Sequence, residues 1–257
     1  MENQALQEFK KLLEIMDELR QKCPWDRKQT YQSLRTHTIE EVYELADAVI
    51  NENDDEIKKE LGDILLHIVF YSKIGEENNT FNIADVIKSI NEKLIYRHPH
   101  IFGDVKVETA KDVEQNWEKL KLKEANKKTV LGGIPNSMPA MIKAHRIQDK
   151  ARGVGFDWTE KEQVWEKVAE EYQELMHEIK NNSTENIEKE FGDFLFSVIN
   201  AARLYGINPE NALELTNKKF ISRFNYLEQK TIAQGIDLKN MTLEEMNVIW
   251  EEAKKNG

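Results

Sequence analysis

The sequence contains few of the residues that cross-link chains or interrupt helices. Its 257 residues include one cysteine, 5 prolines and 11 glycines. The single cysteine, Cys23, excludes an internal disulfide, and we expect a reduced, cytoplasmic setting. The scarcity of proline and glycine favours long helices, because these two residues supply turns and end helices. No apolar run approaches the ~20 residues that a membrane-spanning helix needs, so we expect no membrane partner.

The sequence also lacks an excess of positive charge. The formal net charge is −11, with 40% hydrophobic and 32% charged residues, a balance that is typical of a globular protein with long amphipathic helices. Broad nucleic-acid binding needs a basic surface that replaces counterions, so we expect no nucleic-acid partner. A small phosphate ligand held through a metal ion remains compatible with this charge.

Two acidic segments of the first half recur in the second half, 130 residues further on. "TIEEVYELADAVI" (38–50) resembles "VAEEYQELMHEIK" (168–180), and "KKELGDILLHIVFYS" (58–72) resembles "EKEFGDFLFSVINAA" (188–202). Downstream, "NEKLIYR" (91–97) matches "NKKFISR" (217–223), and "WEKLK" (117–121) matches "WEEAK" (250–254). The sequence therefore indicates a tandem duplication.

The duplication predicts two repeats, 1–126 and 142–257, joined by a linker at 127–141. The linker sequence "KKTVLGGIPNSMPAM" has two glycines, two prolines and no long period. No convincing series of strands appears, so the predicted class is all-α. The expected helices are 2–21, 34–51, 55–75, 83–96 and 109–125 in the first half, and 138–150, 160–181, 184–205, 209–230 and 242–255 in the second.

Each half places four carboxylates at the edge of apolar helices. On a helix at ~100° per residue, Glu60 and Asp63 fall on a narrow stripe of an otherwise apolar segment. A carboxylate beside a buried face is costly unless something neutralises it. Oxygen ligands without cysteine or paired histidine suit Mg²⁺, or alternatively Mn²⁺. The candidate ligands are Glu41, Glu44, Glu60 and Asp63, and in the second half Glu171, Glu174, Glu190 and Asp193.

Basic and aromatic residues follow the acidic segments. Lys219 and Arg223 lie one helical turn apart, and such a pair near a metal ion suggests contacts with phosphate oxygens. Trp250 offers a plane for a base, and Lys254 follows one turn later. The equivalents in the first half are Lys93, Arg97, Trp117 and Lys121.

Simpler interpretations compete with a functional one. An isolated acidic pair on a helix is usually a solvated face, and a lone tryptophan is more often a core residue. The repetition of the pattern favours a functional interpretation, because the repeated residues include Gly62 and Gly192 inside helices. Glycine at such a position lowers helix stability by ~1 kcal/mol relative to alanine. A close helix or a ligand that approaches the backbone would explain why glycine is present. A di-iron carboxylate bundle is disfavoured, because it needs two E-x-x-H motifs, and the partner of Glu174–His177 has Asp47 in place of histidine.

The order E-E-x-x-E, E-x-x-D in an apolar helix, then K-x-x-x-R resembles the MazG family of all-α nucleoside triphosphate pyrophosphohydrolases. "KCPWDRKQTYQSLRTHTIEEVYEL" and "GGIPNSMPAMIKAHRIQDKARGVGFDW" are similar to the opening and inter-repeat segments of that family, and the resemblance covers almost the whole chain. It implies helical repeats that form four-helix-bundle-type sites and assemble as a homodimer.

The resemblance also implies a chemistry. Members of the family bind a nucleoside or deoxynucleoside triphosphate with Mg²⁺ and cleave between the α and β phosphates, releasing a monophosphate and pyrophosphate, as house-cleaning of the nucleotide pool. It implies that the eight carboxylates above are metal ligands and that the basic and aromatic residues bind substrate. Glu170 and Glu171 are both candidate general bases. We expect catalysis in the second repeat and a structural or secondary role for the first. The alternative is a regulatory nucleotide-binding or interaction protein with little turnover.

Overall fold

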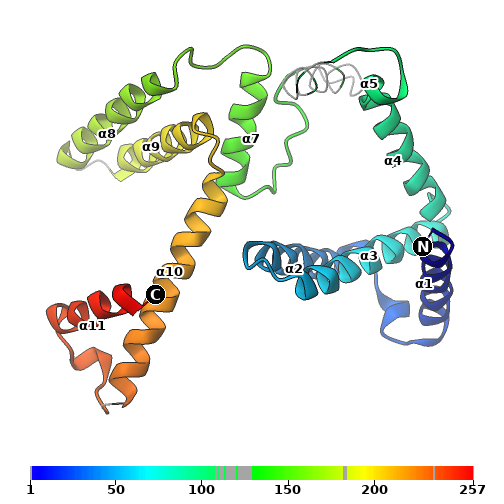
Figure 1. The fold of residues 1–257 in the computed structure, drawn as a ribbon, viewed down its shortest axis with the longest axis horizontal. Helices are drawn as coiled ribbons and strands as arrows, with labels where there is room; N and C mark the ends of the chain where they lie inside the picture. The colour runs from blue at the N-terminus through cyan, green and yellow to red at the C-terminus, as the bar shows by residue number, and fades with distance from the viewer. Residues whose placement is uncertain are drawn as a thin grey trace. The chain divides into compact units, whose positions relative to one another are not determined.

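The computed structural model describes residues 2–107, 109, 113, 120, 129–181, 184–233 and 235–256. The chain divides into two compact units, Met1–Leu120 and Lys121–Gly257. Every regular element among the described residues is a helix, which confirms the all-α class (Figure 1). No helix in the described part of the chain is long and apolar enough to cross a membrane.

Unit 1 is built from an N-terminal helix and a long helical hairpin. Its elements are α1 (Glu2–Lys22), a 3₁₀ turn η1 (Asp26–Lys28), α2 (Tyr31–Ile50), α3 (Asp54–Glu77), α4 (Ile83–Arg97) and α5 (Pro99–Phe102). Polar caps fix where the helices begin: Thr30 and Ser33 form a capping box at α2, and Asn53 accepts from the backbone N–H of Glu56 at α3.

The core of unit 1 lies where α1 packs against the open end of the α2–α3 hairpin. It consists of Met16, Leu34, Val69, Phe70 and Ile74. Leu34 is near the start of α2, and the last three are in the second half of α3. The predicted acidic residues therefore lie between this core and the turn that joins the two helices.

A buried arginine ties the end of α1 to the end of α3. The Arg20 side chain is 9% exposed and forms a two-pronged ion pair with Glu77, with an Nε to Oε1 distance of 2.9 Å. Arg20 also donates to the backbone oxygens of Asp26 and Gln29. The hydrogen bonds from Arg20 lower the pKa of Glu77, so this contact is strongest when the carboxylate is ionised.

Unit 2 contains a second long hairpin. Its elements are α7 (Ala140–Arg152), η2 (Lys161–Gln163), α8 (Val164–Asn181), α9 (Thr184–Leu204), α10 (Pro209–Ala233), η3 (Leu238–Asn240) and α11 (Leu243–Asn256). Helices α8 and α9 pair along their lengths, α7 packs on α9, and α11 packs on α10 (Figure 1). Leu175 on α8 and Ile199 and Ala201 on α9 are buried.

The helices agree with the sequence-based expectations apart from details at their ends. Helix α2 begins at Tyr31 because of the cap at Thr30, and α8 begins at Val164 after a separate 3₁₀ turn. The segment "HPHIF", for which no helix was expected, contains the short helix α5. The expected helix at 109–125 falls mostly outside the described residues.

Two glycines in α3 have opposite surroundings. A Cβ added to Gly75 would lie 2.6 Å from the backbone oxygen of Phe81 and 2.9 Å from its ring carbon Cζ, whereas one added to Gly62 would meet no atom within 4 Å. Gly192 in α9 is equally open. No close helix approach therefore accounts for Gly62 or Gly192 among the described residues.

Substitution of the two glycines by alanine is expected to change stability in opposite directions. Gly75→Ala should lower the free energy of unfolding by ~1–3 kcal/mol, because the backbone at Phe81 must move. Gly62→Ala should raise it by up to ~1 kcal/mol, because alanine is the better helix former. Urea unfolding followed by circular dichroism measures both, and a stabilising Gly75→Ala change would contradict the packing described for α3.

Candidate functional site

The α8–α9 hairpin brings carboxylates from both helices together. Glu171 and Glu174 lie one turn apart on α8, and Glu190 lies on α9. One carboxylate oxygen from each of the three lies within 4.8 Å of the others. Glu171 is buried and Glu190 is half-buried, so water screens these charges only in part.

Unit 1 repeats this arrangement on α2 and α3. Glu41, Glu60 and Asp63 each place one carboxylate oxygen within 4.8 Å of the others. Glu60 is 2% exposed. Each unit therefore gathers three of its four predicted carboxylates into one group.

The fourth carboxylate of each set stands close enough to act electrostatically. Burial and then the charges of Glu174 and Asp193 raise the pKa of Glu190. Burial and then the charges of Asp63 and Glu44 raise the pKa of Glu41. Asp193 and Glu44 thus belong to the same electrostatic clusters although they lie outside the groups of three.

One oxygen in each cluster lacks a partner. The Oε2 atoms of Glu60 and Glu190 are buried and have no hydrogen-bond partner among the described residues. These two glutamates occupy equivalent positions in the two repeats. A buried carboxylate oxygen without a donor is unfavourable, and a cation that binds it removes the cost. The all-oxygen donor set fits Mg²⁺ or Mn²⁺, and the residues that would hold the ion in unit 2 are the three clustered glutamates together with Asp193.

Lysine side chains compensate part of the negative charge. Lys167 Nζ lies 2.8 Å from Glu171 Oε1 and 3.0 Å from Glu170 Oε1, and these hydrogen bonds raise the pKa of Lys167. In unit 1, Lys59 Nζ lies 2.9 Å from Glu60 Oε1. Neither lysine was singled out from the sequence, although the i,i+4 spacing of Lys167 and Glu171 is a recognisable signal.

A cavity of about 630 Å³ lies beside the acidic cluster of unit 2. Glu171, Asp193 and Lys167 line it. The rest of the wall is mainly apolar and comes from α7, α9, the segment before α7 and the "GFDW" loop; it includes Leu131, Ile147, Ala151, Phe156, Trp158 and Phe196. The polar residues Gln148, Asp157, Ser197, Asn200 and Arg203 complete it. Such a mixture of apolar wall and few polar groups is typical of a small-molecule site.

An ion pair holds the "GFDW" loop against α9. Arg203 Nη1 and Nη2 lie 3.0 and 2.5 Å from the two carboxylate oxygens of Asp157, and the arginine side chain is 6% exposed. Burial raises the pKa of Asp157, but hydrogen bonds from Arg203 and from the Trp158 N–H outweigh it and lower the pKa overall. From the sequence, this loop was recognisable only as part of the inter-repeat segment, and its place in the cavity wall was not predicted.

The predicted phosphate-binding residues lie on a different hairpin of unit 2. Lys219 and Arg223 are on α10, and Trp250 and Lys254 are on α11. Trp250 packs on Phe220, with ring centroids 5.0 Å apart. Among the described residues that line the cavity, none comes from α10 or α11.

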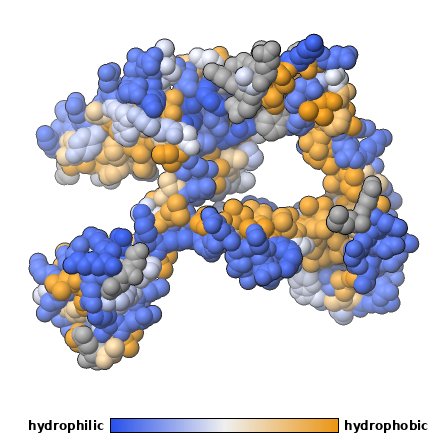
Figure 2. All heavy atoms as spheres, viewed as in Figure 1, coloured by the Kyte–Doolittle hydropathy of each residue, from blue (hydrophilic) through white to orange (hydrophobic). Residues whose placement is uncertain are grey.

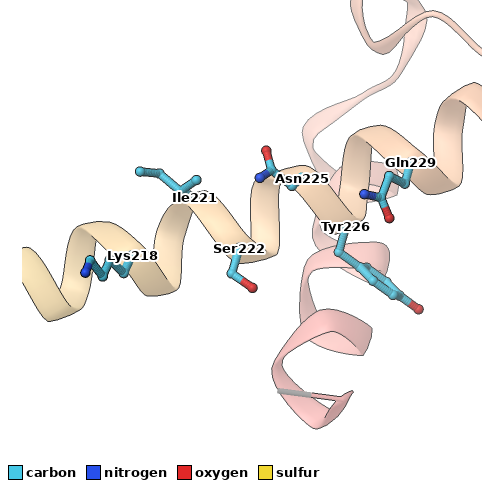
Figure 3. A pocket seen from close by; sticks show the side chains of 6 residues that line it. All are labelled: Lys218, Ile221, Ser222, Asn225, Tyr226 and Gln229. Atoms are coloured by element: carbon cyan, nitrogen blue, oxygen red, sulfur yellow. The ribbon is translucent and has the colours of Figure 1, made fainter. Parts of the chain in front are cut away.

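A shallow groove lies along α10 beside these residues. Figure 3 shows Lys218, Ser222 and Asn225 along the helix and Tyr226 reaching toward α11. The Tyr226 hydroxyl donates to Glu252 Oε1 at 2.9 Å, and Lys230 Nζ lies 2.6 Å from the same oxygen. These contacts hold α11 against α10, so the basic residues of the two helices keep fixed positions relative to one another.

The structure describes two of the four equivalent basic and aromatic residues of unit 1. Lys93 and Arg97 lie on α4, whereas Trp117 and Lys121 lie outside the described residues.

His67 stands in α3 where α9 has Ser197. Its Nδ1 is 2.7 Å from the Thr38 hydroxyl, and burial lowers the pKa of His67. His67 of α3 therefore favours its neutral form and hydrogen-bonds to α2, the helix that carries Glu41 and Glu44.

The two carboxylate hairpins, one in each unit, define an all-α tandem-repeat protein. The family model described as the MazG nucleotide pyrophosphohydrolase domain matches residues 29–102 and again residues 159–227. The chain belongs to the MazG family.

Two curated relatives are similar over nearly their whole length. The nucleoside triphosphate pyrophosphohydrolase/pyrophosphatase MazG of Thermotoga maritima is 44% identical over 250 residues, covering 96% of this chain and 95% of the relative. The nucleoside triphosphate pyrophosphohydrolase of Escherichia coli K12 is 38% identical over 258 residues, covering 97% and 98%. A solved MazG-related protein from Thermotoga maritima aligns with 44% of this chain and 97% of its own, with a TM-score of 0.39 and 26% identity.

The like charges on α8 and α9 predict that Glu190→Gln stabilises the protein in the absence of metal. The raised pKa of Glu190 means that the folded state disfavours the ionised form of this side chain. Ionised Glu190 therefore lowers the stability of the fold as the pH rises above the ordinary carboxyl pKa, and this loss of stability disappears below that pKa. The glutamine amide can also donate to a neighbouring carboxylate. Thermal unfolding at pH 7.5 with a chelator should show a higher midpoint for Glu190→Gln than for the wild type, and at pH 4 the difference should shrink.

Glu188→Gln is the matched control, because Glu188 is an exposed carboxylate on the same helix outside the cluster. It should leave the midpoint nearly unchanged. An equal rise in both variants would show that general surface charge, and not the cluster, sets the cost.

Proposed function

We propose that the protein hydrolyses nucleoside and deoxynucleoside triphosphates between the α and β phosphates, with Mg²⁺ as cofactor and Mn²⁺ as a substitute. The observation that carries the proposal is the three-carboxylate cluster of unit 2, with its buried unpaired oxygen, next to a cavity of nucleotide size. The names of the relatives from Thermotoga maritima and Escherichia coli support the substrate class. The products would be a nucleoside monophosphate and pyrophosphate.

The carboxylates of α8 and α9 would hold the metal ion. Glu171, Glu174, Glu190 and Asp193 supply hard oxygen ligands from two helices that pack tightly on each other. A bound Mg²⁺ supplies Lewis-acid polarisation of phosphate oxygens and lowers the pKa of a bound water molecule. The rigid packing of the hairpin keeps the ligands in place before substrate arrives.

A carboxylate near the cluster would accept the proton of the attacking water. Glu170 and Glu171 both accept a hydrogen bond from Lys167. Only Glu171 lines the cavity, whereas Glu170 is exposed and does not. In the geometry described, Glu171 therefore has the shorter path to a bound substrate, and Lys167 orients it.

The basic residues of α10 and α11 would bind the phosphate groups. Lys219, Arg223 and Lys254 carry positive charges that stabilise the charge developing on phosphate oxygens. Trp250, held on Phe220, would contact the nucleotide.

The exposed apolar residues of both hairpins favour a homodimer. Figure 2 shows hydrophobic residues on the visible surface of each hairpin. The exposed apolar residues of the two hairpins include Val42, Leu61 and Leu65 in unit 1 and Phe191, Leu195 and Val198 in unit 2. Apolar surface of this kind is unusual on a monomer, and a second copy would cover it. Sedimentation as a single chain at micromolar concentration would contradict the dimer.

The proposed division of labour between the repeats is tested by two matched variants. Asp193→Asn should lower kcat for nucleoside triphosphate hydrolysis on the order of 10²-fold or more, because it removes a charge beside the reacting phosphates. Asp63→Asn, at the equivalent position of unit 1, should lower it far less. Products are identified by ³¹P NMR after incubation with mixed triphosphates and Mg²⁺.

Each outcome of this assay has a distinct meaning. Equal loss in both variants would reject catalysis in the second repeat alone. Orthophosphate in place of pyrophosphate would reject cleavage between the α and β phosphates. Tight nucleotide binding without turnover would identify a regulatory binding protein.

A further inference from the structure

We propose that the cavity between α7 and α9 takes the nucleobase of the substrate and that Gln148 and Asn200 read its hydrogen-bonding edge, one as acceptor and one as donor. This inference rests on the proposed function, since it assigns the part of the nucleotide that lies away from the acidic cluster. It adds two residues that no pattern in the sequence singled out.

Gln148 presents an unpaired acceptor in the cavity wall. The residue is 6% exposed, and its Nε2 donates to the backbone oxygen of Phe196 at 2.8 Å. A carbonyl oxygen only accepts, so this contact fixes which end of the amide is which. The other end, Oε1, is buried and has no hydrogen-bond partner in the part of the chain that the structure describes. A buried acceptor left unpaired is costly, and an N–H of a bound ligand would satisfy it.

Asn200 presents a donor in the same wall. Its Oδ1 accepts from Arg203 Nε at 3.0 Å and from Arg203 Nη2 at 2.8 Å. A guanidinium only donates, so the amide is again fixed, with Nδ2 left to donate to a ligand. Arg203 is itself anchored by Asp157. The ion pair therefore acts as a positioning device for the asparagine amide.

The combination of groups matches a nucleobase. Each of the four bases carries an N–H donor beside an acceptor on its Watson–Crick edge, and enzymes read that edge by hydrogen bonds while aromatic or apolar side chains cover the ring. Phe156, Trp158 and Phe196 supply flat side chains in the same cavity. An acceptor on Gln148 and a donor on Asn200 can pair with the edge of any of the four bases, so the two residues predict recognition of nucleobases as a class.

The position of the pair along α9 suits the length of a nucleotide. Asp193, Phe196, Ser197 and Asn200 share one face of the helix, and all four line the cavity. At 1.5 Å per residue, Asn200 lies ~10 Å along the axis from Asp193. Phosphates at the carboxylate end would therefore place the sugar and base toward Asn200. Trp250 does not line this cavity and would contact another part of the substrate.

The first test compares substrates with and without a base. Gln148→Met keeps the size of the side chain but removes the acceptor, together with the donor to the backbone oxygen of Phe196. For ATP, GTP, CTP and UTP we expect kcat/KM to fall about 10- to 100-fold, the worth of one good hydrogen-bonded base contact. For 1-deoxyribose 5-triphosphate, which has no base, it should change less than about 2-fold. Gln173→Met, at an exposed glutamine of α8, is the control and should match the wild type.

The outcomes separate this inference from the proposed function. Equal loss on the substrates with and without a base would assign Gln148 a merely structural role and overturn the inference, as would no loss on any substrate. If the wild type hydrolysed none of them, the proposed function would fail, and calorimetric binding of AMP and of ribose 5-phosphate would decide the inference. Weaker binding of AMP alone in Gln148→Met would support it, and equal binding would overturn it.

The second test reverses one hydrogen bond. Asn200→Asp keeps both acceptor contacts for Arg203 but replaces the Nδ2 donor with an acceptor. Two acceptors match guanine, whose N1–H and N2–H₂ are neighbouring donors. The ratio of kcat/KM for GTP to that for UTP should rise at least about 10-fold over the wild type. A uniform fall for all bases, which leaves the ratio unchanged, would overturn the assignment of Asn200.

Discussion

Mutual repulsion among carboxylates is the constraint around which unit 2 is arranged. Glu171, Glu174 and Glu190 hold oxygens within 4.8 Å of one another, and Glu190 Oε2 is buried without a donor among the described residues. Like charges at this distance oppose folding unless packing elsewhere outweighs them. The tight pairing of α8 with α9 supplies that packing, through buried residues such as Leu175 and Ile199. A cation would turn the same arrangement from a cost into a binding site.

The two units solve the same electrostatic problem with different partners. In unit 2 Lys167 binds Glu171 from the same helix, one turn earlier. In unit 1 Lys59 binds the adjacent Glu60, and a neutral His67 replaces a serine on the carboxylate helix. The acidic frame was thus retained in both repeats while its surroundings changed. The described cavity beside a carboxylate cluster belongs to unit 2, which accords with the proposed role of the second repeat.

The repeated acids could be predicted from the sequence because both relevant signals are local. Helical period places Glu190 and Asp193 on one stripe, and the recurrence of Glu60 and Asp63 makes chance improbable. Helix bounds shifted where a side-chain cap decided the start, as at Thr30.

Gln148 and Asn200 could not be found in this way. The amide of Gln148 is oriented by a tertiary contact with Phe196. The amide of Asn200 is oriented by Arg203 of the same helix, and the tertiary ion pair with Asp157 holds that arginine in place. Gly62 and Gly192 also could not be interpreted from the sequence, since no described protein atom closely approaches either of them.

The central claim is that the α8–α9 carboxylates form a metal site. It is tested most directly by a crystal structure of the protein grown with Mn²⁺, using the anomalous signal of manganese to locate the ion. The account predicts a strong anomalous peak bonded to oxygens of Glu171, Glu174 and Glu190, including the Oε2 atom of Glu190. Electron density that shows the three glutamate side chains in this conformation but no anomalous peak between them, at millimolar Mn²⁺, would contradict the claim.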